Sequence, residues 1–111
     1  MADHSVKKID SSASPTGPDG QKYLVSGKAL AMRLWEEAAG TAGEPHTRDY
    51  ETVGYVVSGA VEIHLSGDVV TCRAGDSYLV PDGAERQYVV VEDLVAVEAT
   101  SPPAHIHGRD A

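Results

Sequence analysis

Two pairs of side chains in this sequence place a guanidinium beside an imidazole or a phenol at the spacing of an extended strand. His46 and Arg48 are two residues apart, and so are Arg86 and Tyr88. Because alternate residues of a strand point to the same side, each pair shares one face. A guanidinium grips carboxylate or phosphate, and an imidazole exchanges protons near neutral pH. These residue types suit chemistry on a small organic anion.

Other candidate groups give weaker evidence of a function. His105 and His107 have the same spacing near the C-terminus, where a solvated tail is a better interpretation than a metal site. His64 alternates with apolar neighbours, which predicts an exposed or interface side chain. Cys72 lies in a strand-like run and is interpreted as a small buried apolar residue, since one cysteine cannot form a disulfide within the chain. The sequence holds no nucleophile constellation and no phosphate-binding loop.

The elements that must position these groups are short strands separated by Gly, Pro and Asp turns. Seven or eight strands at regular spacing predict an all-β sandwich or barrel. Gly59 lies between two of them and predicts a hairpin or tight corner, and Pro81-Asp82-Gly83 predicts a turn. The expected strands cover residues 21–26, 29–36, 52–58, 60–65, 69–73, 77–80, 86–91 and 94–99.

The strand expected at 29–36 has two distinct faces, although its composition also allows a helix. Arg33 and Trp35 share one face, and we expect them at a subunit interface, with pocket lining as the lesser alternative. The other face carries Leu30, Met32 and Leu34.

The chain of 111 residues is expected to form one domain. Residues 1–20 are polar and rich in Gly, Pro and Ser, which predicts a flexible N-terminal arm. Residues 21–100 form the β-barrel domain, and residues 101–111 form a C-terminal tail.

Two spaced motifs resemble those of the cupin family, whose members are small jelly-roll barrels. The second cupin motif, G-x5-P-x-G-x2-H, is matched by Gly75, Pro81 and Gly83, with Arg86 at the histidine position. The resemblance covers roughly residues 21 to 99. It implies a single cupin-like jelly-roll β-barrel.

The first motif, G-x5-H-x-H-x3/4-E-x6-G, is matched less well. Gly59 takes its closing glycine, and Gly40 falls at the opening glycine. The remaining motif positions, which in cupins bind a metal, hold His46, Arg48 and Thr52 in this chain. The resemblance therefore keeps the glycine and proline scaffold and one of the four metal-ligand residues.

In cupins these positions point into the barrel mouth, so the resemblance implies a pocket. Strand alternation then sends Thr52, Gly54 and Val56 inward from one strand, and Arg86, Tyr88 and Val90 inward from another. The pocket expected from this placement holds His46, Arg48, Thr52, Arg86 and Tyr88.

Arginine has no lone pair to offer a metal ion and stays charged. No metal is therefore expected at the usual place. A register slip of one residue would bring in Glu51 beside His46, which is too few ligands for a tight site. A divalent metal ion held by His46 and residues outside the motif stays open as an alternative.

The net charge of the chain limits the kinds of partner that it can bind. Nine basic and 17 acidic residues give a net charge of −8, which disfavours nucleic acid and anionic membranes. No stretch is apolar enough to span a membrane and no secretory signal is visible, so a cytoplasmic location is expected. We expect a homodimer, because cupins commonly pair and small barrels gain from covering their edges.

Three functions follow from the sequence. The first is a pocket binding a small organic anion through Arg48, Arg86, Tyr88 and Thr52, with His46 as acid or base of a metal-independent isomerase or lyase. The second is a divalent-metal-dependent cupin enzyme with a rearranged ligand set. The third is a non-catalytic barrel used in protein–protein contact.

A purely structural alternative also exists for the two arginines. An acidic neighbour within the protein can neutralise a buried guanidinium without any ligand. The candidates for that role are Asp49, Glu51, Glu85 and Glu98.

Overall fold

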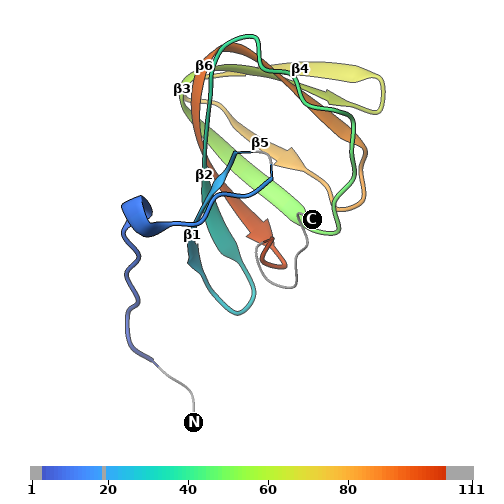
Figure 1. The fold of residues 1–111 in the computed structure, drawn as a ribbon. Helices are drawn as coiled ribbons and strands as arrows, with labels where there is room; N and C mark the ends of the chain where they lie inside the picture. Colours follow the sequence, from blue (N-terminus) through green and yellow to red (C-terminus); the bar gives the residue numbers. More distant parts are fainter. Residues whose placement is uncertain (1–3, 19, 105–111) are drawn as a thin grey trace.

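A computed structural model describes residues 4–18 and 20–104 and shows one six-stranded antiparallel sheet that curls around a core (Figure 1). The strand order is β1-β2-β6-β3-β4, and β5 also pairs with β3. The elements are η1 (Ser11–Ala13), β1 (Lys22–Ser26), β2 (Ala31–Glu37), β3 (Glu51–Leu65), β4 (Asp68–Arg73), β5 (Ser77–Val80) and β6 (Arg86–Ser101). The all-β prediction is confirmed. Among the described residues, no helix is long and apolar enough to cross a membrane.

Two long, bent strands replace four of the short strands expected from the sequence. β3 runs for 15 residues and β6 for 16, and they pair along most of their length. The predicted hairpin at Gly59 is wrong, because β3 continues through it with register shifts against β6 between Val56 and Val61. Gly59 has a φ of +85°, and a Cβ there would collide with the Asp93 carbonyl oxygen. The glycine therefore permits a bulge that bends the strand rather than a turn that ends it.

The core lies on the concave side of this sheet, where alternate residues point inward. Val56, Val61, Val90 and Leu94 are fully enclosed, and Cys72 packs with them as expected. The burial of β3 alternates from Glu51 to Val57, so Thr52, Gly54 and Val56 face inward and Glu51 faces outward, as predicted. With no Phe in the chain, branched aliphatic side chains supply most of this packing.

The segment between β2 and β3 crosses the open side of the sheet and is fastened to β6. Isolated bridges join Ala42 to Val89 and His46 to Arg86. The backbone N–H of Gly43 also donates to the Tyr88 carbonyl, at 3.1 Å. These bonds hold residues 41–50 as a wall facing β2.

The residues before β1 also make ordered contacts. Thr16 pairs with Lys22, and the Tyr23 N–H donates to the Pro15 carbonyl at 3.0 Å. Asp10 caps η1 by accepting from the Ser12 N–H at 3.0 Å. The domain limits proposed from the sequence, with an arm at 1–20 and a tail at 101–111, stay predictions.

Candidate functional site

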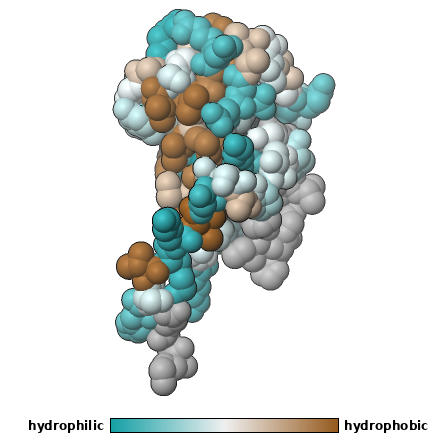
Figure 2. Space-filling view, turned by 60° about the vertical axis from the view of Figure 1, so that its left-hand side comes forward, coloured by the Kyte–Doolittle hydropathy of each residue, from teal (hydrophilic) through white to brown (hydrophobic). Residues whose placement is uncertain are grey.

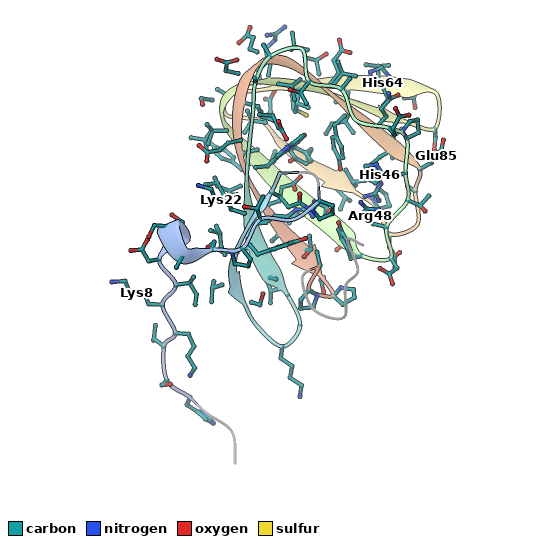
Figure 3. The ribbon with its side chains drawn as sticks, viewed as in Figure 1. Lys8, Lys22, His46, Arg48, His64 and Glu85 are labelled. Carbon is teal, nitrogen blue, oxygen red and sulfur yellow. The ribbon has the colours of Figure 1, made fainter. Side chains whose placement is uncertain are left out.

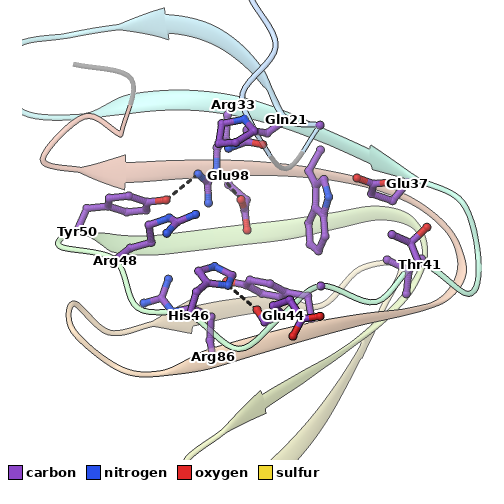
Figure 4. Close-up of a pocket in the computed structure, with 16 residues that line it drawn as sticks. Gln21, Arg33, Glu37, Thr41, Glu44, His46, Arg48, Tyr50, Arg86 and Glu98 are labelled. Atoms are coloured by element: carbon purple, nitrogen blue, oxygen red, sulfur yellow. Dashed lines mark hydrogen bonds and ion pairs between the residues drawn. The ribbon is translucent and has the colours of Figure 1, made fainter. Parts of the chain in front are cut away.

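A cavity of about 550 Å³ lies between β2, β6 and the wall formed by residues 41–50 (Figure 4). Its lining is mixed, with arginines, glutamates, aromatic rings and small residues. The lining residues are Pro18, Gly20, Gln21, Arg33, Trp35, Glu37, Thr41, Gly43, Glu44, His46, Arg48, Tyr50, Arg86, Tyr88, Val90 and Glu98.

Four of the five residues expected in the pocket line this cavity, namely His46, Arg48, Arg86 and Tyr88. Thr52 does not. It faces inward but is completely enclosed, and its Oγ1 has no hydrogen-bond partner in the described part of the chain. Strand alternation correctly predicted that Thr52 faces inward. How far Thr52 lies below the cavity depends on how the neighbouring strands pack, which alternation does not predict.

His46 is held in a defined orientation. Its backbone exchanges two hydrogen bonds of 2.9 Å with Arg86, and its Nδ1 lies 2.8 Å from the Glu44 carbonyl oxygen. A carbonyl only accepts, so Nδ1 carries a proton and donates it to this bond. In the neutral ring Nε2 is then left as a proton acceptor. His64, which Figure 3 also labels, lies near the C-terminal end of β3, and its Nε2 is 3.1 Å from Glu62 Oε1.

Arg86 is 1% exposed, which makes it the largest fully buried side chain among the described residues. Its Nε donates to the Ala84 carbonyl at 2.8 Å and its Nη2 to the Pro81 carbonyl at 3.0 Å. Within the described residues, Nη1 makes no hydrogen bond and no carboxylate forms an ion pair with this guanidinium. Among the described residues, two carbonyl groups are therefore the hydrogen-bond partners that stabilise this full positive charge at the cavity wall.

Arg48 is half-buried, and its backbone contacts the turn at residues 81–84, to which Arg86 is also bonded. Its Nη1 donates to the Thr47 carbonyl at 3.2 Å, and its own carbonyl accepts from the Gly83 N–H at 2.9 Å. Figure 4 shows the Arg48 and His46 side chains on the same side of the cavity. The turn at residues 81–84 thus ties both arginines to one place.

The structure adds an ion pair that the sequence did not predict. Arg33 is 7% exposed, and its Nε lies 2.7 Å from Glu98 Oε1. Its Nη1 donates to the Tyr50 hydroxyl at 3.0 Å, and its guanidinium lies over the Tyr50 ring. Arg33 and Trp35 both line the cavity, as in the lesser alternative for this pair, and the expected subunit interface stays a prediction. Of the candidate counter-charges, Glu98 pairs with Arg33 and not with Arg86.

Glu98 has a second hydrogen-bond partner, so each of its carboxylate oxygens is bonded. Tyr78 Oη donates to Glu98 Oε2 at 2.5 Å. Burial raises the pKa of Tyr78 well above its usual range, and the Glu98 carboxylate raises it further. Tyr78 therefore stays protonated and remains a donor at neutral pH.

Two aromatic side chains form the middle of the cavity wall. The rings of Trp35 and Tyr88 meet edge to face, with centroids 5.1 Å apart and an angle of 70°. The Tyr88 hydroxyl is buried and has no hydrogen-bond partner among the described residues. Burial raises the Tyr88 pKa, with a further contribution from Glu98, so the hydroxyl stays neutral. Tyr88 thus presents its ring, and not its hydroxyl, to the cavity.

The donor set does not fit the metal that cupins usually hold. Among the described residues, no group of three His, Cys, Asp or Glu side chains is arranged to hold an ion. Of the described histidines, His46 alone lines the cavity, and Arg48 and Arg86 stand where further ligands would be needed. His105 and His107 lie outside the described residues.

Comparison with known proteins identifies the family and the fold. A family model for the cupin domain matches residues 33–101. No curated protein sequence matches the chain.

Solved structures share the fold. KdgF from Halomonas sp. is 27% identical, with a TM-score of 0.68 over 74% of this chain and 76% of that one. An RmlC-like cupin from Shewanella frigidimarina is 22% identical, with a TM-score of 0.75 over 88% and 92% of the two chains. The EutQ protein of Clostridium difficile is 21% identical, with a TM-score of 0.72 over 94% and 77%.

Proposed function

The chain belongs to the cupin domain family, and on that premise we propose that its pocket binds a small organic anion, a carboxylate or a phosphate, without a metal ion. The observation that carries this proposal is the Arg86 guanidinium, which is enclosed at the cavity wall and has carbonyl partners but no carboxylate partner in the part of the chain that the structure describes. Burying a charge without a counter-charge is costly, and a bound anion would offset that cost.

Arg48 and His46 supply the direct contacts to the anion in this proposal. Both are half-buried and line the same side of the cavity. An arginine can bind a carboxylate or phosphate with two parallel hydrogen bonds, and the neutral His46 ring keeps its Nε2 beside the anion as a proton acceptor. Glu98 does not compete for this role, because Arg33 and Tyr78 already occupy its two oxygens.

His46 is also the residue that we propose as acid or base, in an isomerase or lyase type of reaction. Its Nε2 accepts a proton from a carbon next to the carboxylate and returns it to the same or another carbon. The measurement is hydrogen–deuterium exchange of bound carboxylates in D2O by NMR. His46→Gln should abolish exchange that the wild-type protein catalyses.

Isothermal titration with acetate and with phosphate tests anion binding directly. We expect binding by the wild-type protein, and none of acetamide, the neutral analogue of acetate. Arg48→Gln should weaken binding at least about tenfold, the cost of a charge-assisted hydrogen bond. Arg73→Gln is the matched control, because Arg73 is exposed and pairs with Glu92 at 3.4 Å, remote from the cavity lining.

Arg86→Met is a second variant, but Arg86 also fastens the turn at Pro81 and Ala84. Its folding must therefore be confirmed by circular dichroism. Equal binding of acetate by wild type and a folded Arg48→Gln protein would overturn the proposal. So would about one bound metal ion per chain that is required for binding.

We also propose that two copies associate through an apolar patch on the outer face of the sheet, formed by Met32, Val53, Tyr55, Val57 and Leu79. These side chains are 39–56% exposed. Val53 pairs with Leu79 and with Ala99, which pairs in turn with Met32, so the patch is continuous across four strands. Figure 2 shows apolar side chains gathered along one side of the molecule. A patch free of charge is where two chains of net charge −8 can approach each other.

Sedimentation velocity measures this association. Tyr55→Glu should produce monomers, while Val70→Glu, at an exposed position of β4 outside the patch, should not. A wild-type monomer at high concentration would contradict the proposal.

A further inference from the structure

The cavity changes in character along β2, which supplies one side of it. Arg33, Trp35 and Glu37 are alternate residues of this strand and all line the cavity. At about 3.3 Å of rise per residue, each lies about 7 Å from the next. A ligand whose charged group reaches the arginines therefore has the rest of its body beside Trp35.

The wall beside Trp35 is suited to a flat apolar surface. Tyr88 meets Trp35 edge to face, and Val90 follows Tyr88 on the same face of β6. The His46 ring lies 6.2 Å from the Tyr88 ring, so imidazole, phenol and indole stand in series. The Tyr88 hydroxyl is enclosed and cannot serve a ligand's hydroxyl groups. A sugar-like body placed against these rings would lose hydrogen bonds to water that the ring faces do not replace.

We propose that the ligand is a carboxylate carried on a flat, apolar body such as an aromatic ring, and that Trp35 is the residue that selects this body. The proposal rests on the anion site described above, and it names the class of anion. The carboxylate lies at Arg48 and His46, near the positive charge of Arg86. The ring packs against the surface that Trp35 and Tyr88 form together, where aromatic contacts add to the area removed from water.

Intrinsic fluorescence provides a direct readout, because Trp35 is the one tryptophan in the sequence. Benzoate, acetate and galacturonate are the probes, each titrated by calorimetry and by fluorescence. We expect benzoate to bind at least about tenfold more tightly than acetate and to change the emission of Trp35. Galacturonate should gain nothing over acetate.

Substitutions distinguish what the aromatic rings of the cavity wall contribute to binding from what its charged groups contribute. Trp35→Leu should bring the affinity for benzoate down to that for acetate, while acetate binding stays unchanged. Trp35→Phe should restore most of the preference. If Trp35→Leu fails to fold, Tyr88→Leu serves the same purpose, and Tyr88→Phe is its control because it keeps the ring.

The outcomes distinguish this inference from the function on which it rests. Binding of acetate and benzoate with equal affinity would overturn the choice of an aromatic body and leave the anion site standing. A preference for benzoate that survives in folded Trp35→Leu and Tyr88→Leu proteins would overturn the role of the aromatic wall. Failure of all three probes to bind would overturn the anion site and this inference together.

Discussion

Tyr78 donates a hydrogen bond to Glu98 across the full width of β3, and the residue that lies between them is Gly54. In the sheet register Gly54 pairs with Tyr78 on one side and with Glu98 on the other, and Glu98 pairs with Arg33. A glycine leaves room for the Tyr78 ring to cross β3. This row of four residues commits Glu98 to Arg33 and Tyr78, so among the described residues Glu98 does not neutralise Arg86.

Gly54→Ala should destabilise the protein, because a Cβ at this position would collide with the Tyr78 ring. We expect a loss of about 1–3 kcal/mol in the free energy of unfolding, measured in urea. Gly43→Ala is the control, since a Cβ there meets nothing within 4 Å. Equal stability of the two variants would show that Tyr78 moves aside without cost.

Glu98→Gln should be more damaging, because it removes the charge of the carboxylate that pairs with the buried Arg33 guanidinium at 2.7 Å. Breaking a buried ion pair from one side costs about 3–5 kcal/mol. The double variant Arg33→Met/Glu98→Leu should lose less free energy of unfolding than Arg33→Met and Glu98→Leu lose together as single variants. A double-mutant cycle measures this difference. Additive losses would contradict coupling between the two side chains.

Tyr78→Phe and Tyr88→Phe form a matched pair. The first removes a hydrogen bond to a buried carboxylate and should cost about 1–3 kcal/mol. The second removes a buried hydroxyl without a partner and should leave the thermal midpoint unchanged or raise it. A large loss on Tyr88→Phe would mean that its hydroxyl has a partner that matters for folding.

Stability should fall at alkaline pH because of the raised pKa of Tyr78. An unfolded tyrosine ionises near its ordinary pKa of 10.0, whereas folded Tyr78 keeps its proton to higher pH. The stability gained is complete below pH 10 and is lost as the pH rises above it, by about 1.4 kcal/mol per unit for one proton. Urea unfolding between pH 9 and pH 11 should show a shallower decline for Tyr78→Phe than for the wild type. Identical slopes would argue against a raised pKa.

Removal of metal ions should leave both folding and anion binding unchanged, because the cavity lining offers a single imidazole and two arginines at the family's ligand positions. Dialysis against a chelator, followed by titration with acetate, measures this. Loss of binding on dialysis, with recovery on adding one divalent ion, would favour the metal-dependent alternative.

The sequence by itself determined the cupin scaffold and which residues of the central strands face inward. Alternation placed Thr52, Gly54 and Val56 inward on β3. The glycine and proline motifs indicated the cupin fold, because they mark turns that few other residues permit. They also pointed to His46 and Arg86, which the structure brings together through a backbone bridge.

Tertiary structure decided which strands are neighbours and how deep each side chain lies. Alternation gives the side of a strand but not its partner, so the pairing of β2 with β6 that joins Arg33 to Glu98 was not predictable. For the same reason the cavity was only the lesser alternative for Arg33 and Trp35, and Thr52 was assigned to the pocket. Gly59 marked an irregularity in the sequence, but only the long pairing of β3 with β6 made it a bulge rather than a turn. Local sequence fixes backbone preferences, whereas burial and charge pairing depend on contacts between residues far apart in the chain.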